Sequence, residues 1–130
     1  MIAEIEAVVW NKLRYDSTLD VSTGVYLHEV PEEELRPCVV IEASLRPEGG
    51  GTAPVHVAEI RTSVYARQHA QNETLAEKVR TALEGLMYGA PGLRLGPLEL
   101  VQVEPGYEVI WDQYRLTMVW SAVAVLWATA

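Results

Sequence analysis

Hydrophobic residues near the start of the chain recur at helical spacing. Steps of three and four between apolar positions predict an amphipathic helix over residues 2–14, because such positions fall on one side of a helix. The apolar stripe consists of Ile2, Ile5, Val9 and Leu13. Glu6 falls outside this stripe, so we expect it on the polar side of the helix.

The spacing then changes to that of extended chain. Residues 25–27 form a short apolar segment that indicates an edge strand or an extended link. Residues 38–45 are β-branched and almost continuously apolar, as expected of a strand inside a sheet. Residues 55–66 alternate with a period of two, which indicates a strand covered on one face. The covered face carries Ala58, Ile60, Thr62 and Val64. These two longer strands are expected to pair as a hairpin.

A glycine-rich connector lies between the two hairpin strands. It contains Gly49, Gly50 and Gly51 between prolines at 47 and 54. Its side chains are too small to pack against a core, so we expect this connector to be mobile.

The second half of the chain repeats the order of helix and then strands. A helical pattern predicts a second helix over residues 70–87, with Asn72 as a possible N-cap and with Gly89 and Pro91 ending it. Residues 98–104 and 107–112 flank a Pro105-Gly106 pair, which favours a tight turn between two strands. The sequence therefore predicts the α+β class, with a single mostly antiparallel or mixed β-sheet.

The last segment, residues 114–127, is apolar in both registers of a strand. Such a strand needs cover on both faces: helices on one side, and on the other either the rest of the domain or a neighbouring subunit. It would be unusually long, so we expect a bulge or bend near Asp112 and Gln113.

Length and composition limit the architecture. A chain of 130 residues with 49% apolar content suits one domain over residues 1–130 with a sizeable core. The lone Cys38 excludes an internal disulfide and suits a reducing compartment, so cytosolic assembly is expected. No apolar run approaches the ~18 residues of a membrane span.

The charge argues against ordinary nucleic-acid binding. Ten basic and 18 acidic residues give a net charge of −8, which is the wrong sign for a protein that neutralises phosphates. DNA is therefore not expected as a direct ligand.

Motifs for catalysis, metal binding or cofactor binding are not found. The glycine triplet is not followed by Gly-Lys-Ser/Thr, and the spacing of His28, His56 and His69 does not match a zinc site. Cys38 lies among apolar neighbours, which favours an inert buried thiol. We expect no catalytic, cofactor-binding or metal-binding residues, and therefore no enzyme.

Large aromatic and apolar side chains gather in the C-terminal third. Core packing and a subunit interface both explain them, because aromatic residues are enriched in both places. The candidates for an oligomer interface are Trp111, Trp120, Val123, Val125 and Trp127.

The order of elements resembles a known family. It comprises the N-terminal helix, Val25-Tyr26, the segment Arg-Pro-Cys-Val-Val-Ile-Glu at 36–42, the strand ending in Val64-Tyr65-Ala66, the helix containing Leu-Ala-Glu-Lys-Val at 75–79, and the late strand after Trp111-Asp112. Over nearly the whole chain, this order is similar to that of the tail terminator, or tail completion, proteins of long-tailed bacteriophages.

The resemblance implies a structural virion protein. Such a subunit has a sheet with two helices packed on one face. It forms a ring, a homohexamer, that caps the tail tube, ends tube polymerisation and joins the tail to the head connector. The implied partners are other copies of the chain, the tail tube protein and head-tail connector proteins, with DNA only passing through the lumen. The implied location is the virion tail, assembled in the host cytoplasm. A tail-tube or head-tail joining role, and a small-molecule-binding or accessory α+β domain of a cytosolic complex, are alternatives.

Overall fold

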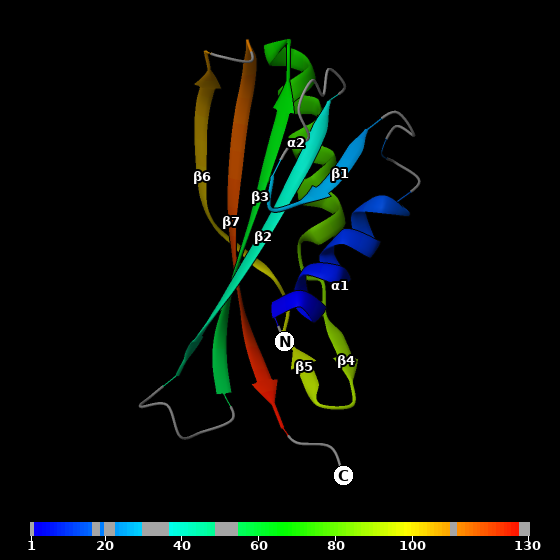
Figure 1. The fold of residues 1–130 in the computed structure, drawn as a ribbon, viewed down its shortest axis with the longest axis vertical. Coiled ribbons are helices and arrows are strands. Elements are labelled where there is room, and N and C mark those ends of the chain that lie inside the picture. Colours follow the sequence, from blue (N-terminus) through cyan, green and yellow to red (C-terminus); the bar gives the residue numbers. More distant parts are fainter. Residues whose placement is uncertain are drawn as a thin grey trace.

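The computed structural model describes residues 2–16, 19, 23–29, 37–48, 55–109 and 112–127. These residues form two helices and seven strands, with three strands after the first helix and four after the second. Figure 1 shows their arrangement. In chain order the elements are α1 (Ile2–Arg14), β1 (Gly24–Leu27), β2 (Cys38–Pro47), β3 (Val55–Ala66), α2 (His69–Leu83), β4 (Tyr88–Ala90), β5 (Leu93–Leu95), β6 (Glu99–Glu108) and β7 (Gln113–Leu126).

All seven strands belong to one mixed sheet. The strand order is β1-β2-β3-β7-β5-β4, and β6 pairs with β7 beside β5. The β1–β2 pair is parallel, whereas the other pairs are antiparallel. Both helices pack on the same core, because Val9 of α1 and Val79 of α2 belong to one buried cluster with Ile60 and Trp120 of the sheet. The predicted α+β class with a single mixed sheet is confirmed.

The first hairpin is confirmed with its alternation. β2 pairs with β3 from Cys38 opposite Tyr65 to Pro47 opposite His56. The predicted core face of β3 is buried along its whole length. β3 begins at Val55, where the two-residue period begins. In the observed register, the small and branched residues of β3 face the helices, and a shift by one residue would turn them to the other face.

Glu6 corrects the prediction for the first helix. It is buried, with 3% of its surface exposed, rather than facing solvent. One carboxylate oxygen lies 2.9 Å from His28 Nε2, and the other accepts a hydrogen bond from the backbone N–H of Ala43 at 3.0 Å. β1 ends at Leu27, so it does not reach Ala43 on the edge of β2. The Glu6 carboxylate supplies the hydrogen-bond acceptor for the Ala43 N–H in its place.

The second helix differs from the prediction at both ends. It begins at His69 after the N-cap Gln68, and Asn72 lies inside it, buried, instead of capping it. The helix ends at Leu83, and the chain then turns at Gly85, whose φ of 78° favours glycine. Gly89 therefore does not end the helix: it lies in β4, and Gly92, with a φ of 90°, forms the turn to β5.

The predicted turn at Pro105-Gly106 is wrong. β6 runs straight through these residues, pairing Pro105 with Leu116 and Gly106 with Arg115 of β7. Proline is tolerated here because β6 pairs with β7 on one side only, so a missing N–H can face away from the ladder. The chain instead reverses after β6, next to Asp112, whose φ is 50°.

The bend expected near Asp112 and Gln113 is found at Asp112, whose φ is 50°, whereas the register shift lies on the neighbouring strand. β7 is continuous over 14 residues, and the register shift falls in β6 between Leu100 and Gln102. A bulge in an edge strand disturbs only one ladder, whereas a bulge in β7 would disturb pairing on both of its sides.

Candidate assembly surface

The face of the sheet opposite the helices carries a group of valines near the end of β7. Val57 pairs with Val123, and Val55 pairs with Val125. Their neighbours along the strands, such as Ala58 and Ala124, are buried in the core, so these valines point away from the helices. We call Val55, Val57, Val123 and Val125 the valine patch.

The valine patch is open to solvent at its centre. Val123 is 53% exposed, and Trp127, just beyond the end of β7, is 43% exposed. Leaving these side chains in water gives up the free energy that burial would supply, at about 25 cal/mol for each Å² of apolar surface. A contiguous apolar group on a sheet face is therefore a candidate contact for another protein.

Arginine side chains border the valine patch on two sides. Arg46 lies beside Val57 on β2, and Arg94 lies beside Val125 on β5. Both are exposed, and neither forms an ion pair with any residue that the structure describes. An apolar centre with a charged rim is the usual anatomy of a protein–protein interface.

The same face becomes polar toward the start of β7. Glu59 lies between Ser44 and Ser121, and beyond this row a hollow of about 250 Å³ opens over the middle of the sheet. In this hollow Arg61 Nη2 lies 3.7 Å from Glu104 Oε1. Ser63 Oγ and Thr117 Oγ1 are hydrogen-bonded at 2.9 Å. These contacts join β3, β6 and β7 across the face.

Arg115 is the centre of a second set of contacts at the edge of this hollow. It donates from Nη1 to Glu108 of β6, and its Nε is buried without a hydrogen-bond partner in the described part of the chain. Its guanidinium lies against Gly106, where a Cβ would come within 2.5 Å of Nη2. A Cβ at position 106 would therefore require the Arg115 guanidinium, the far end of a flexible side chain, to shift.

Tyr65 lies beside Arg115 on the neighbouring strand. Burial raises the pKa of its phenol, Glu108 and Cys38 raise it further, and the Arg115 guanidinium opposes this shift. The phenol is therefore neutral at physiological pH and serves as a hydrogen-bonding group. Tyr65, Arg115 and Glu108 form one cluster, in which the charges of Arg115 and Glu108 are paired. This arrangement suits a fixed polar surface better than acid–base chemistry.

Trp120 lies in the core of its own chain. It is fully buried, and its Nε1 donates to Thr62 Oγ1 at 3.0 Å. Of the two interpretations of the aromatic residues, core packing therefore applies to Trp120, because a side chain without exposed surface has none to give to a partner. The interface expectation is corrected for this residue.

The other interface candidates lie elsewhere. Val123 and Val125 belong to the valine patch, and Trp127 follows them at its end. Trp111 lies outside the described residues, as do the mobile-loop candidates Gly49, Gly50 and Gly51.

The cysteine and histidines are placed as surface or structural groups. Cys38 is buried, as expected of an inert thiol. His28 contacts Glu6, and His69 lies 3.4 Å from Glu73. Among the described residues, no three side chains of the metal-binding types come together. In the same part of the chain, no helix is long and apolar enough to cross a membrane.

Sequence reasoning missed the contacts that organise the polar part of this face. Because a turn was predicted at Pro105-Gly106, the pairing of β6 with the start of β7 was not expected. The contact between Glu108 and Arg115, which depends on this pairing, was therefore missed as well. Arg94 was also missed, because it lies in a three-residue strand whose pattern is too short to indicate a strand.

Comparisons with known proteins place the fold. No family model matches the chain, and no curated protein matches it. Among solved structures, a chain from the "Virion of native gene transfer agent (GTA) particle" superposes with a TM-score of 0.80 at 24% sequence identity. The match covers 95% of this chain and 97% of that chain. At this identity the match shows that the two chains share a fold.

Proposed function

We propose that this chain is a structural protein of a phage-like virion, and that it serves as the tail terminator. In this role, copies of the chain form a ring, a homohexamer, on the end of the tail tube. The ring ends tube polymerisation and provides the surface for the head-tail connector. The role is structural, needs no catalysis, and places the protein in the tail after assembly in the host cytoplasm.

The observation that carries this proposal is the nearly complete match to a virion chain. The TM-score is 0.80 over 95% of one chain and 97% of the other, so the likeness extends over nearly the whole of both folds. The order of elements supports the same role through its resemblance to tail terminators. The partners in this role are the tail tube protein and the connector.

The valine patch is the proposed contact between subunits. Its valines and Trp127 supply apolar surface, and Arg46 and Arg94 provide a charged rim that sets the orientation of the partner. The net charge of −8 suits a ring around a DNA passage, because acidic walls repel phosphates and let DNA pass without binding.

Substitution in the valine patch tests this contact. Val123→Glu places a charge at the exposed centre of the patch, and burying that charge in an interface is costly without a partner. We expect the variant to fold normally and to lose assembly, measured by light scattering over a range of concentrations. The matched control is Val101→Glu, because Val101 is 58% exposed but lies in β6, away from the patch.

Two results would count against this interface. One is assembly that proceeds unchanged in Val123→Glu. The other is equal loss of assembly in Val101→Glu, which would indicate a general effect of added negative charge.

A further inference from the structure

A closed ring of six identical subunits needs two different contact surfaces on every copy. Neighbours in such a ring meet head to tail, so one surface of each copy binds a second, non-identical surface of the next copy. The valine patch is one of these surfaces in the proposed ring. Its counterpart must be partly exposed, apolar at its centre and able to oppose the charge of an arginine.

A groove of about 310 Å³ between α2 and β6 has the apolar part of this description. It is lined by Leu116 and Met118 of β7 and by Leu100 and Val103 of β6. Because α2 packs on β3 and β7, the β6 side chains beyond it are left partly uncovered, and Val103 is 48% exposed. We call this surface, together with the α2 residues that border it, the α2–β6 groove.

The α2 wall of the groove carries negative charge. Glu77 lines this wall and forms no ion pair with any residue that the structure describes. Glu73, one turn earlier, lies 3.4 Å from His69. The cation of the wall, Arg80, has its Nε 3.7 Å from Glu84 Oε2, so a carboxylate already opposes it. Glu77 is therefore the charge that a partner can pair.

The β5 side of the valine patch carries the opposite charge. Arg94 lies beside Val125 and is exposed, whereas its two neighbours within β5 are buried. On the β2 side of the patch, Arg46 is followed two residues later by Glu48, so the two charges there offset each other. Arg94 is therefore the cation that can meet Glu77 of another copy.

The two surfaces of one copy cannot meet each other. The valine patch lies on the face of the sheet away from the helices, whereas the α2–β6 groove lies on the helix side. Seven residues of β7 separate Leu116 in the groove from Val123 in the patch, which is about 23 Å of extended chain. Figure 1 shows that β7 runs along the length of the sheet, so the two surfaces lie toward its two ends. A contact between them therefore joins different copies.

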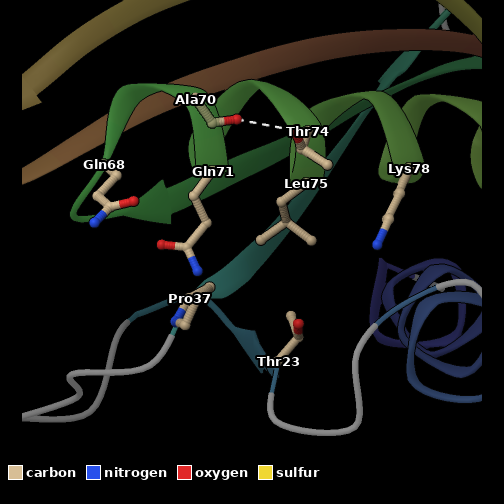
Figure 2. A pocket seen from close by; sticks show the side chains of 8 residues that line it. All are labelled: Thr23, Pro37, Gln68, Ala70, Gln71, Thr74, Leu75 and Lys78. Atoms are coloured by element: carbon tan, nitrogen blue, oxygen red, sulfur yellow. Dashed lines mark hydrogen bonds between the residues drawn. The ribbon is translucent and has the colours of Figure 1, made fainter.

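The other side of α2 does not match the patch. There, Figure 2 shows Gln71 and Lys78 pointing from the helix toward Thr23 and Pro37. The Lys78 ammonium has the same sign of charge as Arg94, and amide and hydroxyl groups lose hydrogen bonds to water when they face valines.

We propose that the α2–β6 groove of one copy receives the valine patch of the next copy. Val123 packs against Val103 in this contact, and Arg94 faces Glu77. The inference rests on the proposed ring, and it names the second surface that the ring requires.

A charge swap tests the pairing of Arg94 with Glu77. Arg94→Glu and Glu77→Arg each bring like charges together, so each should weaken assembly at least about tenfold. The double variant should restore assembly, because every interface then holds opposite charges again. The matched control is Arg94→Glu with Glu84→Arg, which has the same net charge as the swap but changes a residue outside the groove. It should stay weak. Sedimentation velocity over a range of concentrations measures each variant.

A mixture of two blocked variants tests the head-to-tail geometry. Val103→Glu blocks the groove and Val123→Glu blocks the patch, so neither should assemble alone. Their mixture should form a 1:1 dimer that grows no further, because each partner keeps one intact surface. Val101 is 58% exposed in the same strand but does not line the groove, so Val101→Glu should assemble alone.

Three outcomes would overturn the pairing, and they separate it from the ring itself. Loss of assembly in Val123→Glu but not in Val103→Glu or Glu77→Arg would exclude the groove while keeping the valine patch as a ring contact. A double swap no stronger than its single variants would exclude the contact between Arg94 and Glu77. An original chain that stays monomeric at every concentration would count against the ring and against the pairing with it.

Discussion

Individual buried polar side chains fasten the helices to the sheet. Glu6 joins α1 to β2 through the Ala43 N–H, and Asn72 joins α2 to two strands. The Asn72 Nδ2 donates to the carbonyl oxygens of Val64 at 2.8 Å and Tyr114 at 3.3 Å. Sequence patterns assign such residues to the helix surface or to a cap, because a polar residue is normally solvated. Most of their hydrogen-bond partners lie far away in the chain, so the local sequence pattern does not indicate that these residues are buried.

Removal of the Asn72 carboxamide should lower stability. Asn72→Ala deletes two hydrogen bonds from a buried site, so we expect a loss of about 1–3 kcal/mol in the free energy of unfolding. Urea denaturation monitored by circular dichroism measures it. Asn11→Ala is the matched control, because Asn11 is the chain's other asparagine and is exposed on α1. It should change stability by less than about 0.5 kcal/mol. Equal effects of the two substitutions would contradict a structural role for Asn72.

Elements with a clear period were predictable, whereas those that depend on distant partners were not. The helix over 2–14 and the strand over 55–66 have the predicted bounds, because their apolar faces repeat over several turns or residues. The strand through Pro105-Gly106 was missed because the local turn signal is strong, and the pairing with β7 that overrides it is long-range. The end of α2 was placed too late for a related reason: Tyr88–Ala90 pairs with Leu93–Leu95 instead of continuing the helix.

Gly106 and Arg115 should be energetically coupled. A methyl group at position 106 meets the Arg115 guanidinium, which must move and weaken its contact with Glu108. In the original chain Gly106→Ala should therefore be destabilising. In an Arg115→Met background it should be neutral or stabilising, because alanine reduces the entropy of the unfolded chain. We expect a coupling of about 0.5–1 kcal/mol from a double-mutant cycle in urea.

A strand glycine with free space provides the control for this coupling. Gly89→Ala in β4 meets nothing within 4 Å of the new Cβ, so it should show no coupling to Arg115→Met. Purely additive effects of Gly106→Ala and Arg115→Met would show that the two residues do not interact in solution.

The two faces of the sheet differ in how their apolar side chains are covered. Both helices cover the first face, whereas the valine patch and Trp127 leave apolar side chains exposed on the second. The sequence indicated this division, since residues 114–127 are apolar in both registers, and it pointed to Val123, Val125 and Trp127. It could not separate them from Trp120, because burial depends on which register faces the helices. The arginine rim depends on strand pairing and was not predictable from local pattern.

The length distribution of tail tubes is the most direct measure of the proposed terminator role. The tube protein encoded by the same genome is polymerised with increasing amounts of this chain, and the tubes are imaged by electron microscopy. A terminator should shorten the tubes in a dose-dependent way and appear as a ring at one end, and Val123→Glu should do neither. Tubes of unchanged length with bare ends, at concentrations where the chain is folded, would contradict the terminator role.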